Sequence, residues 1–249
     1  MMIELFFFYT IEIMFLIWGG IMFIVLLSKP ANYGRHAKSG INYRIAWVIM
    51  ESVSLFMYLI CYFIGNRLYN VVAIIFMCLF VGHYINRAFI FPFLVRGKEF
   101  IPFSIMMTGV LFNLINGYLQ GRWLTYFGPI LEINWLLTPQ FLIGITIFFI
   151  GVIINLHSDH ILRTLRKHGD RGYKIPFGGV FKWVSCGNYL GEVIEWVGWA
   201  ILTWSFSGLV FAFWVMANLI PRARSHHKWY LEHFPDYPKD RKAIFPFLI

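Results

Sequence analysis

The feature of this sequence that most constrains its fold is a series of long apolar segments. Each segment is close to the roughly 20 residues that a helix needs to cross a bilayer. Seven such segments can be placed, at approximately residues 5–27, 45–64, 71–94, 102–119, 139–157, 187–204 and 205–221. We therefore predict an all-α integral membrane protein with seven transmembrane helices.

The composition supports a membrane protein, and two of the segment assignments leave alternatives. The chain is 59% hydrophobic and only 13% charged, with a mean hydropathy of +0.66, which lies outside the range of soluble domains. The last two segments form a nearly unbroken run in which only Ser205 to Gly208 offers a turn, so six spans with one long tilted helix is an alternative. The first segment is too long for a cleavable signal peptide and lacks a positive leading region, so we interpret it as a span.

The basic residues indicate an orientation for these helices. Short cytoplasmic loops of membrane proteins collect Lys and Arg, and here all but three of the 21 basic residues follow the first, third, fifth and seventh spans. The exceptions are Arg67 and Arg122 in the opposite loops and Arg87 inside the third span. We predict an outside N terminus, a cytoplasmic C terminus, and cytoplasmic loops at 158–186 and 222–249. The net charge of +9 then follows mostly from topology and requires no nucleic-acid partner.

Several other classes of protein find no support in the sequence. The three cysteines, Cys61, Cys78 and Cys186, form no CxxC pair, so neither a disulfide framework nor a zinc or other metal site is indicated. The sequence has no internal repeat and no linker or composition break that would separate domains. We predict a single membrane-embedded domain over residues 1–249.

Polar residues within the spans are the main functional signal, because such residues are costly in lipid unless they are paired, hydrated or used. For an isolated residue such as Glu12, hydrogen bonding between helices is the simpler interpretation. The other polar residues recur at i, i+3 and i+4 spacings, so each group shares a helix face and could line one cavity. They are Glu51; His83, Tyr84, Asn86 and Arg87; Asn155, Asp159, Arg163 and Arg166; and Asn188, Glu192 and Glu195.

The basic members of this set gather toward the predicted cytoplasmic side, which suits a ligand that carries phosphates. Arg is the usual side chain for bidentate phosphate contacts. The glycine-rich segment KIPFGGVF resembles neither a P-loop nor the GxGxxG fingerprint. A nucleotide site in this protein would therefore consist of helix faces and loops.

Four segments of the chain resemble the steroid 5α-reductases, also called 3-oxo-5α-steroid 4-dehydrogenases. They are the span that contains Glu51, GHYINRAFIFP, NLHSDHILRTLRKHGDRGYKIPFGGVFKWVSCGNYLGEVIEWVGWA, and HHKWYLEHFPDYPKDRKAIFPF. The resemblance covers most of the chain and is strongest after residue 150. It implies a seven-helix membrane enzyme that reduces the 4,5 double bond of a 3-oxo-4-ene steroid with NADPH.

The resemblance also implies roles for individual residues. Glu51 and Tyr84 fall on the pair that polarises the substrate carbonyl, where a donor lowers the barrier because negative charge develops on that oxygen. The cofactor contacts fall on Arg87, Asn155, Asp159, Arg166, Tyr173, Asn188, Glu192, Arg222, His226, Tyr230 and Arg241. A steroid or other lipid enone would enter from the bilayer, and we expect a monomer.

One departure from the family pattern leaves the substrate open. The family usually has Gln before the glutamate of the second span, and here the residue is Met50. Methionine cannot supply the amide hydrogen bond, so a steroid with another ring system is one alternative. Within the reductases, an enoyl thioester or polyprenol substrate is the nearest alternative. Isoprenylcysteine-type methyltransferases, which bind S-adenosylmethionine, and a non-enzymatic lipid binder are others. The sequence is compatible with a bacterial inner membrane and with the endoplasmic reticulum.

Overall fold

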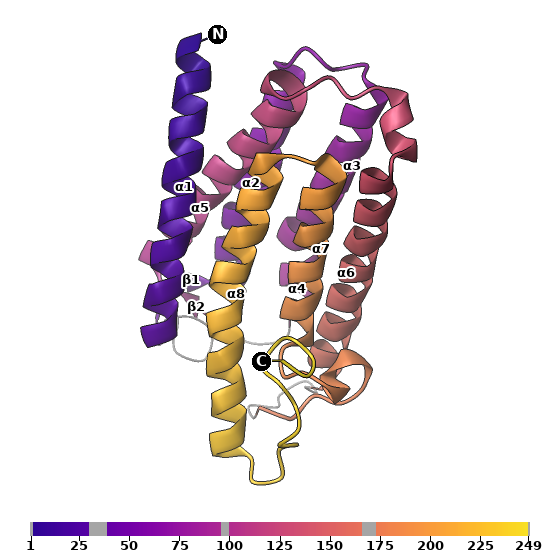
Figure 1. Ribbon diagram of the computed structural model, residues 1–249. Coiled ribbons are helices and arrows are strands. Elements are labelled where there is room, and N and C mark those ends of the chain that lie inside the picture. The colour runs from indigo at the N-terminus through magenta and orange to yellow at the C-terminus, as the bar shows by residue number, and fades with distance from the viewer. Residues whose placement is uncertain (1, 30–38, 96–99, 166–172, 249) are drawn as a thin grey trace. The chain divides into compact units, whose positions relative to one another are not determined.

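A computed structural model describes residues 2–29, 39–95, 100–165 and 173–248, and these residues are mostly helical (Figure 1). Every predicted span coincides with one of seven long helices in this part of the chain. The long helices are α1 (Met2–Ser28), α2 (Tyr43–Phe63), α3 (Val71–Ile85), α5 (Phe103–Arg122), α6 (Pro139–Thr164), α7 (Gly187–Thr203) and α8 (Phe206–His233). Asn42 and Asn70 cap α2 and α3 by accepting backbone N–H groups of their first turns.

Among the described residues, five helical stretches are long and apolar enough to cross a membrane. They are Met2–Ser28, Tyr43–Phe63, Val71–Leu94, Pro139–Thr164 and Phe206–His233. Helices α5 and α7 are not in this set: α7 has only 17 residues, and α5 buries several amide side chains. The protein is thus a multi-pass membrane protein. That α5 and α7 also cross, and that the C terminus is cytoplasmic, remain predictions.

The helix α3 continues to Leu94 through a π-helical turn at Asn86–Ile90 and the short helix α4 (Phe91–Leu94). Pro92 has no N–H to donate to the preceding turn. The Phe91 N–H donates to the Asn86 carbonyl, five residues back. After α4, strand β2 (Phe100–Ile101) pairs antiparallel with β1 (Ile41–Asn42). This pairing places the first residues of α2 and α5 next to each other.

The boundary between the last two helices lies at Trp204 and Ser205. Trp204 has a φ of 46°, in the left-handed region that helices do not use, and the hydroxyls of Thr203 and Ser205 lie 2.9 Å apart across the turn. Two helices are therefore present, and the alternative of one long helix is wrong. Helix α8 continues to His233, so the start of segment 222–249, which the sequence suggested to be a loop, is helical.

The chain divides into two compact units. Unit 1 comprises Met1–Phe15, Asn32–Leu142 and Thr203–Ser207, and unit 2 comprises Leu16–Ala31, Ile143–Leu202 and Gly208–Ile249. The single membrane-embedded domain remains a prediction.

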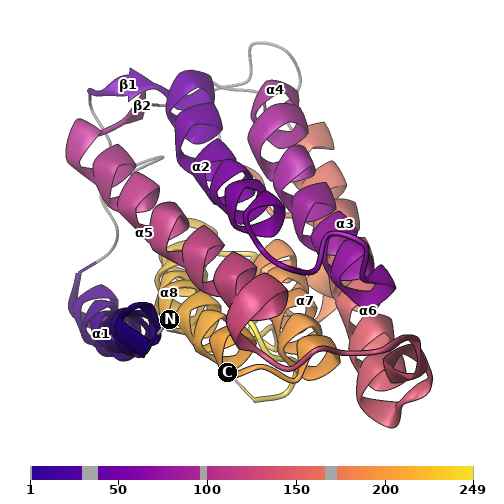
Figure 2. The same ribbon diagram turned by 90° about the horizontal axis from the view of Figure 1, so that it is seen from above.

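In unit 1, glycines allow α2 and α5 to lie side by side (Figure 2). A Cβ at Gly117 would lie 2.6 Å from the Ser54 carbonyl oxygen, and one at Gly121 would lie 2.6 Å from the Cys61 side chain. Neither distance is compatible with a larger residue. The two backbones therefore approach closely enough for short polar side chains to bond across the contact.

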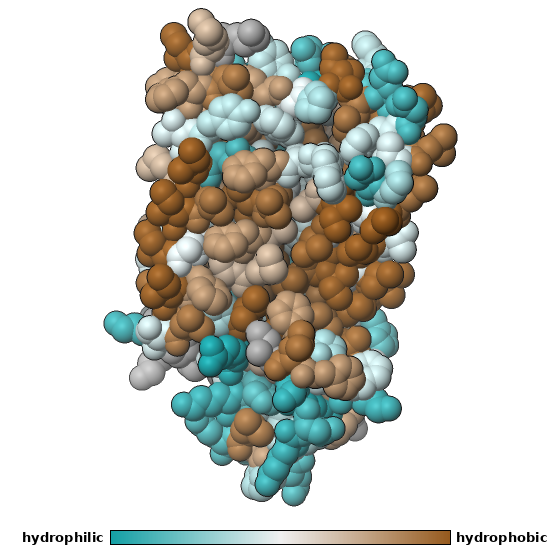
Figure 3. Space-filling view, in the orientation of Figure 1, coloured by the Kyte–Doolittle hydropathy of each residue, from teal (hydrophilic) through white to brown (hydrophobic). Residues whose placement is uncertain are grey.

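Glycines also allow α6 and α7 of unit 2 to pack closely. A Cβ at Gly151 would overlap the backbone of Glu195, and one at Gly191 would overlap the backbone of Asn155. In Figure 3, brown apolar side chains cover the middle of the helices, and teal hydrophilic side chains are most concentrated at the end of the view where α8 ends at His233. The polar residues of unit 2 are therefore concentrated at one end of its helices.

The two basic residues that break the charge pattern of the loops have structural roles in unit 1. Arg67 is buried and donates to the carbonyls of Leu124, Tyr126, Gly128 and Pro129, and burial lowers its pKa from the ordinary value.

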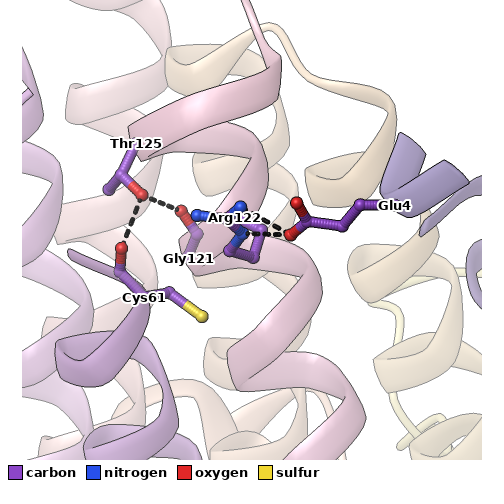
Figure 4. Close-up of polar contacts among 5 residues, drawn as sticks. All are labelled: Glu4, Cys61, Gly121, Arg122 and Thr125. Carbon is purple, nitrogen blue, oxygen red and sulfur yellow. Dashed lines mark hydrogen bonds and ion pairs between the residues drawn. The ribbon is translucent and has the colours of Figure 1, made fainter. Parts of the chain in front are cut away.

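Arg122 pairs with Glu4 at 2.5 Å (Figure 4). Its guanidinium also packs over the ring of Tyr126. Because both exceptions are used in packing, they do not weaken the predicted orientation.

Candidate active site

The predicted substrate-polarising residue Tyr84 is fully enclosed by protein near the end of α3. Its side chain is only 2% exposed. The Asn116 side-chain amide, on α5, donates to the Tyr84 hydroxyl oxygen at 3.0 Å, and the same Nδ2 lies 3.4 Å from the Ser54 hydroxyl on α2. The phenol is thus held at a point where three helices of unit 1 meet.

Glu51 lies on the face of α2 that is turned toward α3. Trp47, Glu51 and Ser54 are spaced by four and three residues, so they share one face of the helix. Above Glu51, the Arg87 guanidinium lies 5.0 Å from the centre of the Trp47 ring. One turn below, Ser54 shares its amide partner with Tyr84. Glu51, which is half-buried, is therefore within one helical turn of both contacts.

The π-helical turn at Asn86–Ile90 sets the direction of Arg87, three residues after Tyr84. Its guanidinium also lies 5.0 Å from the ring centre of Phe91, so two aromatic rings hold the charge. π-helical turns occur frequently at functional sites. Arg87, which the resemblance assigns to the cofactor, belongs to unit 1 together with Glu51 and Tyr84.

The predicted cofactor residues of α6 and α7 lie together in unit 2. The Asn155 amide donates to the Asn188 carbonyl at 2.9 Å, which joins the two helices. Asp159, one turn further along α6, is buried, whereas Asn188 and Glu192 on α7 are half-buried. The close approach at Gly191 makes this arrangement possible.

Helix α8 contributes a third set. Arg222, His226 and Tyr230 recur every four residues and so share one face. The Tyr189 hydroxyl on α7 lies 3.4 Å from His226 Nε2, which fixes this face of α8 to the first turn of α7. Polar side chains from α6, α7 and α8 are thus gathered at one end of unit 2.

The loop before α7 and the C-terminal tail are bound to each other through Arg241. Arg241 is 3% exposed, donates to the Pro176 carbonyl at 2.9 Å and lies over the rings of Phe177 and Tyr237. Tyr173 packs edge-on against Trp229 at 5.1 Å. Both predicted residues therefore make contacts within the protein. Arg166 lies outside the described residues.

Two groups of polar residues were not predicted from the sequence. In unit 2, the Ser185 hydroxyl lies 2.6 Å from both His227 Nδ1 and the Tyr237 hydroxyl, and burial raises the pKa of Tyr237. The residues predicted from the sequence include His226 but not the adjacent His227.

In unit 1, the amides of α5 were overlooked although Asn113, Asn116 and Gln120 follow an i, i+3, i+7 spacing in an apolar segment. That spacing was the available signal.

The donor set of unit 2 fits a dinucleotide. Amides, carboxylates, an imidazole, a phenol and the Arg222 guanidinium lie on three neighbouring helices, which matches a ligand that carries both hydrogen-bonding heterocycles and phosphates. Within the described ranges, no group of three or more His, Cys, Asp or Glu side chains could hold a metal ion.

Comparisons with known proteins give a consistent result over nearly the whole chain. Residues 99–249 match the family described as 3-oxo-5-alpha-steroid 4-dehydrogenase. The chain is 42% identical over 239 residues to 3-oxo-5-alpha-steroid 4-dehydrogenase 1 of Bos taurus, which covers 93% of each chain. It is 43% identical over 235 residues to Steroid 5-alpha-reductase DET2 of Solanum lycopersicum, which covers 91% of each.

The corresponding protein of Homo sapiens, 3-oxo-5-alpha-steroid 4-dehydrogenase 1, is 44% identical over 222 residues, covering 87% of this chain and 85% of that protein. Identity of this size over this much of both chains leaves no room for a chance likeness. The chain belongs to the 3-oxo-5-alpha-steroid 4-dehydrogenase, or steroid 5α-reductase, family.

Proposed function

We propose that this protein reduces the 4,5 double bond of 3-oxo-4-ene steroids with NADPH, giving 5α-3-oxosteroids. The observation that carries the proposal is the buried Tyr84 hydroxyl, which accepts a hydrogen bond from Asn116 and lies near the face of α2 that bears Glu51. Relatives that match over nearly the full length are named for this activity.

The residues of unit 1 would act on the enone carbonyl. Tyr84 donates a hydrogen bond from its hydroxyl to the carbonyl oxygen as negative charge develops there, and keeps its proton. Glu51 orients this donor, or donates itself if burial keeps it protonated. When bound, NADPH supplies the hydride that the β carbon receives. The α carbon then takes a proton from water or a nearby acid, so the steroid gains two hydrogens in all.

The residues of unit 2 would bind the cofactor. Arg87, in unit 1, is the further residue that the resemblance assigns to it. Asn155, Asn188 and Glu192 offer hydrogen bonds from α6 and α7, and Arg222 offers a charged contact to phosphate from α8. Asp159, Arg166, Tyr173, His226, Tyr230 and Arg241 complete the proposed set. Because Tyr173 and Arg241 also hold the loop and the tail, their substitution would affect the shape of the site as well as the contact.

The orientation with a cytoplasmic C terminus would place the hydrophilic end of unit 2 in the compartment that contains NADPH. The large apolar side chains exposed along α1 and α2, such as Phe6, Ile13, Phe56 and Phe63, suit contact with lipid. A steroid dissolved in that lipid would reach the protein sideways. Protease treatment of a C-terminal tag in sealed vesicles whose cytoplasmic face is outward tests the orientation. We expect the tag to be cleaved, and a protected tag would contradict the proposal.

The function is tested with detergent-purified protein, a 3-oxo-4-ene steroid, and NADPH that carries deuterium at both C4 positions. We expect NADPH consumption and a product three mass units heavier than the substrate, with the deuterium at the β carbon. The matched control is the corresponding 5α-3-oxosteroid, whose 4,5 bond is already saturated, and which should cause no consumption.

Other outcomes identify the alternatives. NADPH binding without steroid reduction would contradict the proposed substrate, and enoyl thioesters and polyprenols would then be the next substrates to assay. Absence of NADPH binding together with binding of S-adenosylmethionine would contradict the reductase and favour a methyltransferase.

A further inference from the structure

A series of buried polar side chains in unit 1 leads from Tyr84 to the first helix. Its members are each at most 2% exposed and come from α1, α2, α3, α5 and α8. They are Glu12, Ser54, Tyr84, Asn116, Gln120 and Ser207. Groups this deeply buried within apolar helices are costly unless their hydrogen bonds are made. The direction of each hydrogen bond in the series therefore bears on whether the Tyr84 hydroxyl can donate a hydrogen bond.

The direction of each hydrogen bond can be followed from the far end of the series. The Gln120 Nε2 group donates to the Ser207 carbonyl at 2.8 Å, which fixes which end of that amide is the donor. The same nitrogen lies 3.5 Å from Asn116 Oδ1. Asn116 therefore turns its oxygen toward Gln120 and its nitrogen toward Tyr84. The Ser207 hydroxyl bonds to Glu12 at 2.5 Å and holds the first turn of α8 in place.

The orientation of the Asn116 amide determines whether the Tyr84 hydroxyl can donate a hydrogen bond to a substrate. An amide N–H that donates to the Tyr84 oxygen uses a lone pair and leaves the tyrosine proton for donation. It also stabilises the negative charge that grows on this oxygen when the proton is shared with a substrate. A reversed amide would accept the tyrosine proton and direct it away from the substrate.

We propose that Asn116 is a positioning residue, which holds the Tyr84 hydroxyl as a donor toward the carbonyl of the substrate. The proposal rests on the proposed function, because it assumes that Tyr84 polarises an enone. Asn116 acts only through Tyr84 and need not touch the steroid. Gln120 and the Ser207 carbonyl fix the orientation of the Asn116 amide, so they act on Tyr84 only through Asn116.

The competing interpretation is that Asn116 only joins helices, as buried amides in membrane proteins often do. The two interpretations differ in whether the effect of changing Asn116 depends on the Tyr84 hydroxyl. We expect Asn116→Leu to lower kcat about tenfold, the upper value for one neutral hydrogen bond, with an unchanged KM for NADPH. In a Tyr84→Phe background the same change should lower kcat less than about twofold, because coupled residues are not additive.

A second variant tests the direction of the bond without changing the volume. Asn116→Asp replaces the donor by a carboxylate, which would accept the tyrosine proton. We expect its kcat at pH 8 to fall at least as far as that of Asn116→Leu. The ratio of wild-type kcat to variant kcat should then shrink as the pH falls, because a protonated carboxyl can donate again.

Thr125→Val is the matched control for the loss of a buried hydrogen bond between helices. Its hydroxyl is buried in the same unit, where it lies 2.7 Å from the Gly121 carbonyl and 3.0 Å from the Cys61 carbonyl (Figure 4). Both bonds go to backbone carbonyls outside the series described above. Removing the hydroxyl should therefore lower the melting temperature, and any effect on kcat should be the same with and without the Tyr84 hydroxyl.

The outcomes separate the two proposals. A wild-type enzyme that reduces no 3-oxo-4-ene steroid would overturn the proposed function and the positioning role with it. Active wild type together with an Asn116→Leu loss that is equally large in the Tyr84→Phe background would overturn the positioning role alone. A loss that disappears in that background, with the pH-dependent recovery of Asn116→Asp, would establish it.

Discussion

The polar residues of unit 1 and those of unit 2 are held in different ways. Around Tyr84, short side chains bond to one another within the helical packing, and each of these groups is almost completely buried. At the hydrophilic end of unit 2, polar side chains stand on three helix faces and several remain half-buried. There the loop and the tail are held by backbone carbonyls and stacked rings.

This difference corresponds to two tasks. A group that must aim one proton at one atom benefits from rigid, buried partners, because misalignment weakens a hydrogen bond steeply. A surface that binds a large charged ligand needs many accessible donors and loops that can close around it. The comparison therefore predicts that changes near Tyr84 act on turnover, whereas changes in unit 2 act on binding.

The largest expected effect is that of Tyr84→Phe. The variant removes one hydroxyl and leaves the ring, which packs against Phe80 at 4.7 Å. We expect kcat to fall by about 100-fold to 1000-fold, the usual loss when a donor to a developing oxyanion is removed, with NADPH affinity unchanged. Product formation by mass spectrometry and NADPH titration measure the two quantities. Full turnover by the variant would contradict the polarising role.

Arg222→Ala should weaken NADPH binding without a comparable loss of kcat at saturating cofactor. A charged hydrogen bond contributes about 1.5 to 3 kcal/mol, which corresponds to roughly a tenfold to hundredfold increase in Kd. The matched control is Arg224→Ala, since Arg224 is exposed and lies two residues further along α8. Equal effects of the two variants would indicate a general influence of charge and would count against a specific contact at Arg222.

Ser185→Ala tests how the tail of unit 2 is fastened. It removes the hydroxyl that lies 2.6 Å from both His227 and Tyr237. A buried group that loses its partner costs about 1 to 3 kcal/mol, and each kcal/mol lowers the melting temperature by about 2 to 4 °C in a chain of this size. Thermal unfolding in detergent measures the shift. Ser104→Ala, at an exposed serine of α5, is the control, and a shift no larger than the control's would show that the tail is held elsewhere.

The smallest effect on turnover is expected for Met50→Gln, which restores the residue usual in the family. Met50 is buried in an apolar cluster with Ala46, Ile101 and Met106. A glutamine there would be surrounded by hydrocarbon, so we expect reduced stability and a change in steroid preference below about twofold. Ratios of kcat/KM for two 3-oxo-4-ene steroids measure the preference. A large change would mean that this side chain reaches the substrate.

The helices and the residues of the proposed site were accessible from the sequence to different degrees. The seven helices could be predicted because the segments that form them are apolar over nearly their whole length. The end of α8 could not, because the helix continues beyond Pro221 to His233, through a polar segment that gives no hydropathy signal. Tyr84 could be predicted as a site residue because His83, Asn86 and Arg87 lie beside it in an apolar segment. Asn116 was marked only by its spacing to Asn113 and Gln120.

The sequence by itself determined the class of protein, the positions of the seven long helices and the family, because these depend on local hydropathy and on long ordered similarity. Only the tertiary structure decided which polar residues meet. Asn116 lies 32 positions from Tyr84 and 62 from Ser54, and their bonds exist because Gly117 lets α5 approach α2. A hydrogen bond depends on distances of about 3 Å and on direction, and these arise when the helices pack.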